Sequence, residues 1–300
     1  MTLFSLIVVL LLEQLRPLPV ERFVLAPLRG LAAALAKQRN EQLGWVALVV
    51  GGAAVCGFIA WLLPWLLSVV FAIVVLYLTL GFRHESHYFT DIHLALRTQE
   101  LGVARELLAR WRNAPRRDEA DADEVARQAI EQAMVSAHRC VFGVVFWFAV
   151  LGPCGAALYR LSRFLYDEWG ARRDEEAPGG FGKFSRQAFV AIDWLPSRMT
   201  AILFAISGNF EDAVFCWRAQ SVMWPDRGAA VLVSAGAGAL GVKLEQSNAP
   251  GTEGSENLEV GVGEKAGVDD MQATVGLVWR ALIVCLAVLA LTTIAVVLGK

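Results

Sequence analysis

One charge-free run dominates the pattern of apolar and polar positions along the chain. Thirty-nine consecutive residues, Gly44 to Phe82, contain no Asp, Glu, Lys, Arg or His. A helix that crosses the hydrocarbon core of a bilayer needs about 20 apolar residues, so this run is long enough to cross twice. Pro64 lies at its middle between Trp61 and Trp65, where a turn at headgroup level would place a helix breaker and two interfacial aromatic residues. The pattern therefore predicts a hairpin of two spans in an integral membrane protein.

Three further apolar segments predict helices in or on a membrane. Met1 to Leu12 lacks the basic start and the small-residue cleavage site of a signal peptide, so we interpret it as a retained membrane or interfacial helix. Cys140 to Tyr159 is a span of 20 uncharged residues interrupted by Gly152-Pro153, and Ala281 to Gly299 is the last span.

Two more apolar segments are too short to cross a bilayer alone. Met199 to Phe210 has 12 residues and Gly228 to Val242 has 15, which favours re-entrant or broken helices covered by protein. Lys243 to Gln272 is rich in Gly, Glu and Asp, which is typical of a flexible acidic loop. The chain is thus predicted to be an all-α, polytopic integral membrane protein. It forms a single membrane domain, residues 1–300, with about four to five transmembrane or interfacial helices and broken or re-entrant segments.

The largest polar region, Arg83 to Arg139, predicts a cytosolic helical region. Apolar positions spaced among charges indicate two amphipathic helices, separated by a proline-containing turn that begins at Asn113. Asp121 or Asp123 is placed to cap the second helix. Nine Arg lie here, and a basic connection precedes the hairpin, so the positive-inside rule places both in the cytoplasm. Arg160 to Arg198, with seven basic residues, then conflicts with that rule unless the preceding segment is re-entrant, and its sidedness stays open.

Composition agrees with a membrane protein and narrows the partners. Hydrophobic residues make up 56% of the chain and charged residues only 19%, and the net charge is -2. A net charge this small gives no basic surface for nucleic acid, so the predicted partner is the lipid bilayer. The ten Trp residues suit an interfacial aromatic belt. The five Cys form no CxxC pair or zinc-like cluster, and we interpret them as buried thiols.

Two motifs carry candidate chemistry, and each has a simpler structural interpretation. Gly236 to Gly241 matches GxGxxG, but its flanks are small apolar residues, which favours close helix packing over a dinucleotide site. On a helix His84, His87 and Asp91 share one face, as a metal site requires. They also lie where a polar helix would leave the membrane, and we predict no metal site.

Charged side chains near the apolar segments are the other candidates. Five arginines could steer an anionic substrate or contact anionic lipid headgroups, and we favour the lipid interpretation: Arg105, Arg110, Arg112, Arg116 and Arg117. Asp193 and Arg198 flank Trp194-Leu-Pro196, immediately before a short apolar segment. They form either an interfacial ion pair or part of a polar pocket.

Several segments in order resemble one family. They are Arg127-Gln-Ala-Ile-Glu131, Gly152-Pro-Cys-Gly-Ala156, Leu158-Tyr159-Arg160, Phe181-Gly-Lys-Phe184, Asp193-Trp-Leu-Pro-Ser-Arg-Met-Thr-Ala201 and Ala237-Gly-Ala-Leu-Gly-Val242, and together they resemble the CobD/CbiB family. Two other segments look more like AmpE, a membrane regulator of the same superfamily. They are Met1-Thr-Leu-Phe with Glu13, and Gly208-Asn-Phe-Glu-Asp-Ala213 with Trp217.

The resemblance implies a function, although two polar loops of the family are not matched in this sequence. The CobD/CbiB family implies a multi-pass enzyme of the bacterial inner membrane that acts in cobalamin biosynthesis. It attaches an aminopropanol unit to adenosylcobyric acid by amide-bond formation, which implies ATP, Mg²⁺ and a corrinoid substrate. Two of the family's polar loops are replaced here by Met134-Val-Ser-Ala-His-Arg-Cys140 and Met223-Trp-Pro-Asp-Arg-Gly228. A non-catalytic regulatory protein resembling AmpE is therefore the alternative.

Four charged residues match the family's segments and lie at the ends of apolar stretches: Glu131, Arg160, Asp193 and Arg198. Because an isolated charge at that depth costs about 2.5 to 3.5 kcal/mol, pairing among them is favourable, and we predict that they converge on one substrate-binding pocket. Glu131 or Asp193 would then hold a divalent cation, while the two arginines would hold phosphate. No catalytic residue is assigned.

Overall fold

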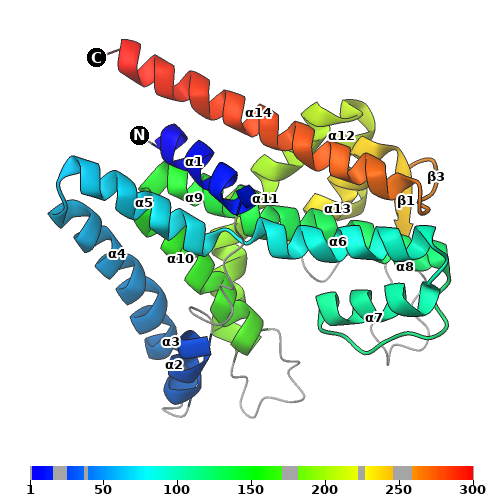
Figure 1. The fold of residues 1–300 in the computed structure, drawn as a ribbon, viewed down its shortest axis with the longest axis horizontal. Coiled ribbons are helices and arrows are strands. Elements are labelled where there is room, and N and C mark those ends of the chain that lie inside the picture. The colour runs from blue at the N-terminus through cyan, green and yellow to red at the C-terminus, as the bar shows by residue number, and fades with distance from the viewer. Residues whose placement is uncertain are drawn as a thin grey trace. The chain divides into compact units, whose positions relative to one another are not determined.

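The computed structural model describes residues 2–15, 26–36, 40–170, 182–221, 227–245 and 259–299. The chain divides into two compact units, each assembled from two separate stretches. Unit 1 combines Met1–Gly81 with Arg139–Pro196, and unit 2 combines Phe82–His138 with Ser197–Lys300. Almost all of the regular structure is helical (Figure 1), so the predicted all-α class is confirmed.

Unit 1 is built around α10 (Pro153–Leu165), which packs against α9 (Gly143–Leu151), α4 (Gly51–Leu62) and α5 (Trp65–Thr79). This unit also contains α1 (Thr2–Leu15), α2 (Ala26–Ala36), α3 (Glu41–Trp45), the π-helical turns η2 (Val46–Val50) and η4 (Tyr166–Gly170), and the first part of α11 (Lys183–Ser207). At the α9–α10 junction Gly152 has φ +64° and Pro153 starts the next helix, so the predicted Gly-Pro interruption is confirmed.

The charge-free run folds as two helices that meet at Pro64 (Figure 1). Leu63 is extended, Pro64 caps α5, and the side chains of Trp61 and Trp65 are 79% and 64% exposed. The break predicted at Pro64 is confirmed. The predicted second span is not among the helices long enough to cross, because the extended Leu80 ends α5 after 15 residues.

Four helices among the described residues are long and apolar enough to cross a membrane. By length and composition they are Glu41–Leu62, Ala122–Leu151, Lys183–Ser207 and Asp270–Val296. The last contains most of the span predicted from Ala281 onward. The span predicted from Cys140 begins earlier, because α8 (Ala122–Ala137) continues through the π-helical turn η3 (His138–Phe142) into α9. The protein is therefore a multi-helix membrane protein.

One predicted broken segment is wrong. Met199 to Phe210 does not form a separate short helix, since its first nine residues are the end of α11 (Lys183–Ser207), a continuous helix of 25 residues. Three charged residues interrupt the uncharged pattern of this helix: Arg186, Asp193 and Arg198. The pattern therefore did not predict the span. The helix also continues through Pro196.

Unit 2 contains α6 (Phe82–Arg97), α7 (Leu101–Arg112), α8, α12 (Phe210–Gln220), α13 (Arg227–Leu240) and α14 (Asp270–Leu298). A small sheet of order β2-β1-β3 accompanies them: β1 (Val242–Glu245) is antiparallel to β2 (Glu259–Gly261) and parallel to β3 (Glu264–Lys265). Residues 243–272, predicted as a flexible loop, thus contain strands and the start of α14. Residues 246–258 lie outside the described residues.

The two amphipathic helices predicted in the polar region are α7 and α8. Asn113 adopts the left-handed conformation that ends α7, with φ 50° and ψ 44°. Asp121 Oδ1 accepts a hydrogen bond from the backbone N–H of Glu124 at 2.6 Å, so Asp121 is the N-cap of α8. Sequence analysis did not separate α6, which precedes these two helices.

The GxGxxG segment lies within α13 and its C-terminal end, where it packs helices closely. A Cβ at Gly238 would lie 2.5 Å from the backbone oxygen of Asp212 in α12, and a Cβ at Gly236 would collide with the side chain of Met134 in α8. A dinucleotide fingerprint would instead connect a strand to the start of a helix. Close helix packing therefore accounts for these glycines.

Candidate functional site

The four predicted site residues are divided between the two units. Arg160 in α10 and Asp193 in α11 belong to unit 1, whereas Glu131 in α8 and Arg198 in the second half of α11 belong to unit 2. Their convergence on one pocket stays a prediction.

Asp193 is part of a buried hydrogen-bonded arrangement in unit 1. The hydroxyl of Tyr159 donates to Asp193 Oδ1 at 2.7 Å, and the Asp193 residue is only 5% exposed. The ring of Tyr159 packs against Phe189 with centroids 5.8 Å apart, and Gly143 leaves room for that ring because a Cβ there would overlap it. The observed contact favours a structural role for Asp193 over metal binding.

Glu131 has a cationic neighbour within unit 2. Glu131 is half-buried on α8, and the guanidinium of Arg112 in α7 favours its charged form. Arg112 also donates to Gln128 Oε1 at 3.0 Å. A guanidinium beside Glu131 would compete with a bound cation, and Asp193 already accepts a hydrogen bond from Tyr159, so cation binding by either residue stays a prediction.

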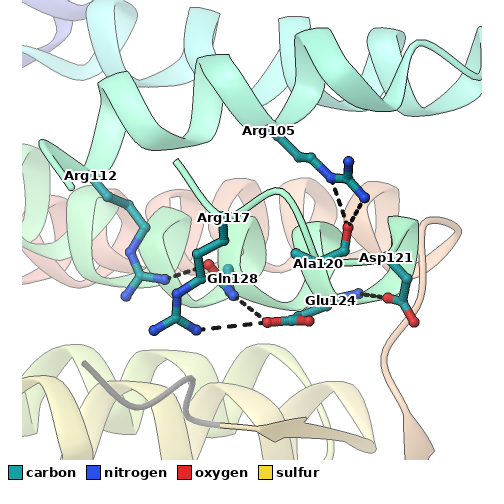
Figure 2. Close-up of polar contacts among 7 residues, drawn as sticks. All are labelled: Arg105, Arg112, Arg117, Ala120, Asp121, Glu124 and Gln128. Atoms are coloured by element: carbon teal, nitrogen blue, oxygen red, sulfur yellow. Dashed lines mark hydrogen bonds and ion pairs between the residues drawn. The ribbon is translucent and has the colours of Figure 1, made fainter. Parts of the chain in front are cut away.

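Most of the arginines predicted to contact lipid have partners inside unit 2. Several of them make polar contacts with α8 or with the segment that joins α7 to α8 (Figure 2). Arg105 donates through Nε and Nη2 to the backbone oxygen of Ala120, at 2.8 and 2.6 Å. Arg117 lies 3.8 Å from a carboxylate oxygen of Glu124. Arg110 pairs with Glu106, and Arg116 with Asp118. Arg105 holds the α7–α8 connection through Ala120, the exposed pairs of Arg110 and Arg116 contribute little to stability, and lipid contact stays a prediction.

The histidine-rich start of α6 shows no assembled metal site. Arg83 Nε donates to His87 Nε2 at 3.3 Å, and Arg97 Nε donates to His93 Nε2 at 3.2 Å. Within the described part of the chain, no group of three or more His, Cys, Asp and Glu residues is placed to hold a metal ion. The side chain of His84 lies outside that part.

A cavity of about 270 Å³ in unit 2 brings several polar and aromatic side chains together. Residues from α6, α7, α8 and α14 line it, and we call it the Glu85 pocket after the one titratable residue in its described lining. Its polar lining residues are Glu85, Ser86, Thr90, Ser136 and Thr274, and its aromatic ones are Phe89, Trp111 and Trp279. An apolar pocket with a few convergent polar groups is the usual form of a small-molecule site.

Side chains from α7 and α8 fix the carboxylate of Glu85. Its Oε2 accepts hydrogen bonds from Trp111 Nε1 at 2.6 Å and from Ser136 Oγ at 2.9 Å. Trp111 in turn stacks parallel to Tyr88, with ring centroids 6.3 Å apart. The carboxylate is thus oriented before any ligand arrives, which lowers the entropy cost of binding.

Glu85 lies between His84 and His87, in the segment considered for a metal site, and sequence reasoning missed this pocket. One signal was present: Glu85 is the first acidic residue after the charge-free run. A carboxylate so close to a membrane segment is costly unless it has a partner or a role.

The comparisons with known proteins cover most of the chain. The sequence model of the family described as "CobD/Cbib protein" matches residues 16–297. A protein from Stutzerimonas stutzeri (strain A1501), named "Cobalamin biosynthesis protein CobD", is 34% identical over 242 residues, which cover 76% of each chain. A protein of the same name from Chromobacterium violaceum is 32% identical over 230 residues, 75% of this chain and 73% of the relative. No solved structure matches the chain.

Proposed function

The chain belongs to the CobD/CbiB family, and on that premise we propose that it is a membrane protein of cobalamin biosynthesis that attaches an aminopropanol unit to adenosylcobyric acid by forming an amide bond. The family match across residues 16–297 is the observation that carries the proposal. The alternative of a non-catalytic regulator resembling AmpE receives no support from the relatives, since both are named for cobalamin biosynthesis.

An amide-forming ligase of this kind implies ATP and Mg²⁺, and ATP would activate the carboxyl group that is to be joined. Magnesium at nucleotide phosphates is usually held by one or two carboxylates together with phosphate oxygens. Glu131, which is half-buried, fits that requirement, whereas Asp193 is buried against Tyr159. Arg160 and Arg198 remain the proposed donors to phosphate.

Complementation tests the proposed function directly. Expression of the full chain in a strain that lacks its own CobD/CbiB enzyme should restore growth under conditions that require cobalamin synthesis. The empty vector should not restore growth, and added cobalamin should restore it in both strains. If the protein accumulates in the membrane and growth is not restored, the ligase proposal is wrong.

We also propose that the protein lies in the bacterial inner membrane with residues 83–139 in the cytoplasm, because the basic residues concentrate there. Ala114, an exposed residue just after α7, is a suitable position for labelling. An Ala114→Cys variant in intact spheroplasts should react with an impermeant thiol reagent only after the membrane is permeabilised. The unsubstituted chain measures the background from the five native cysteines. Labelling without permeabilisation would reverse the orientation.

A further inference from the structure

We propose that the Glu85 pocket binds the ammonium group of a small primary amine. The identification of that amine as the aminopropanol substrate rests on the proposed function, but the pocket's preference for an organic cation rests on its own geometry. Nothing in the family comparison assigns a ligand to this pocket.

The first observation is a charge with an available oxygen. Oε2 of Glu85 accepts hydrogen bonds from both Trp111 and Ser136, whereas its Oε1 accepts none from the residues that the structure describes. No Lys or Arg is among the described residues that line the pocket. Because a half-buried carboxylate is costly without a counter-charge, the pocket is complementary to a cation.

The second observation is the direction of the hydroxyl groups. Ser86 Oγ donates to the backbone oxygen of Arg83 at 3.0 Å, and Thr90 Oγ1 donates to that of Ser86 at 2.9 Å. Thr274 Oγ1 donates to the backbone oxygen of Asp270 at 3.0 Å. Each hydroxyl proton is therefore used within its own helix, and the hydroxyl oxygens remain as acceptors.

The proton of Ser136 and the indole N–H of Trp111 are both given to Glu85, so the carboxylate and the hydroxyl groups among the described lining residues present acceptors to a ligand. The indole of Trp279, which also lines the pocket, can only donate. The matching ligand group is one that only donates. A protonated primary amine has three N–H donors and no acceptor, whereas a phosphate or a carboxylate would face the like charge of Glu85. The pocket thus selects the amine end of an amino alcohol, and it leaves any anionic end outside.

The third observation is the aromatic wall. Phe89, Trp111 and Trp279 line the cavity, and Phe89 meets Trp111 edge to face at an interplanar angle of 72°. Aromatic faces attract cations through their quadrupole, most strongly for Trp. A volume of about 270 Å³ is also small for a ligand pocket, as suits a short amine better than a nucleotide.

The test measures binding to the purified full chain in detergent, with 1-amino-2-propanol as the probe and isothermal titration calorimetry as the readout. The neutral isostere 1,2-propanediol is the matched ligand. We expect saturable binding of the amine and at least ten-fold weaker binding of the diol. Equal binding of the two compounds, or no binding of the amine, overturns the proposal.

Two variants locate the site. Glu85→Gln removes the charge but keeps an oxygen that can accept from Trp111 and Ser136, and it should weaken amine binding at least ten-fold. The control is Glu106→Gln, which removes a half-exposed carboxylate on α7 and should leave binding unchanged. If Glu85→Gln binds the amine as the unsubstituted chain does, the proposal fails.

A second variant of the pocket tests the proposal if Glu85→Gln does not fold. Ala133→Leu places a larger side chain on the α8 wall of the pocket and should also exclude the amine. Complementation of growth is scored separately from binding. Growth without amine binding overturns the pocket proposal alone, and amine binding without growth overturns the proposed function alone.

Discussion

Replacing Gly238 by alanine is expected to destabilise the protein by about 1–3 kcal/mol or more, since overpacking a tight contact has costs of this order. The added Cβ would lie 2.5 Å from the backbone oxygen of Asp212 and 2.8 Å from the Cα of Ala213. Both are backbone atoms of α12, so relief requires α12 and α13 to move apart. Thermal unfolding of the purified protein in detergent should show a lower midpoint than that of the unsubstituted chain.

The matched control is Gly102→Ala on α7. Gly102 also lies within a helix of unit 2, but a Cβ there would meet no atom within 4 Å. Alanine should therefore stabilise the protein by up to about 1 kcal/mol through helix propensity. If Gly238→Ala leaves the unfolding midpoint unchanged yet abolishes growth complementation, the close-packing interpretation of the GxGxxG segment is wrong, and a ligand site in that segment must be considered again.

Two of the candidate membrane helices, Glu41–Leu62 and the one in α14, were predictable from sequence, because the bilayer imposes its own length and composition on a span. The charge-free run and the last span at α14 follow from counting uncharged residues, and the break at Pro64 follows from the helix-breaking proline between two Trp residues. The Gly152-Pro153 junction follows from backbone chemistry, since Gly152 takes a positive φ and Pro153 begins a helix without needing an N–H donor.

The long helix α11 was not predictable in the same way. Its sequence contains Asp193 and Pro196, which both argue against a continuous apolar span. In the structure, the carboxylate of Asp193 accepts a hydrogen bond from the hydroxyl of Tyr159, which lies in another helix, α10. A pattern within one segment cannot reveal a partner that lies 34 positions away in the sequence.

The Glu85 pocket escaped sequence analysis for the same reason. Its carboxylate comes from α6, its hydrogen-bond donors from α7 and α8, and another part of its wall from α14. Trp111 is 26 positions from Glu85 and Ser136 is 51 positions away. Each side chain has an ordinary local explanation, and only the packing of four helices brings them together.

Tyr159→Phe is expected to destabilise the protein by about 1.5–3 kcal/mol, the usual range for a hydrogen bond to a charged group. The substitution keeps the ring that packs against Phe189 and removes the 2.7 Å hydrogen bond to the buried Asp193. Asp193→Asn should have a smaller effect, because the amide oxygen still accepts from the Tyr159 hydroxyl. Thermal unfolding in detergent measures both.

The double variant and growth complementation distinguish a structural role of Asp193 from a role in the substrate site. If the two residues act mainly through their hydrogen bond, Tyr159→Phe should cost less in the Asp193→Asn background than in the unsubstituted chain. Growth complementation by Asp193→Asn should then follow the amount of protein in the membrane. A stable Asp193→Asn protein, present at normal levels and unable to restore growth, would instead place this carboxylate in the substrate site and overturn the structural assignment.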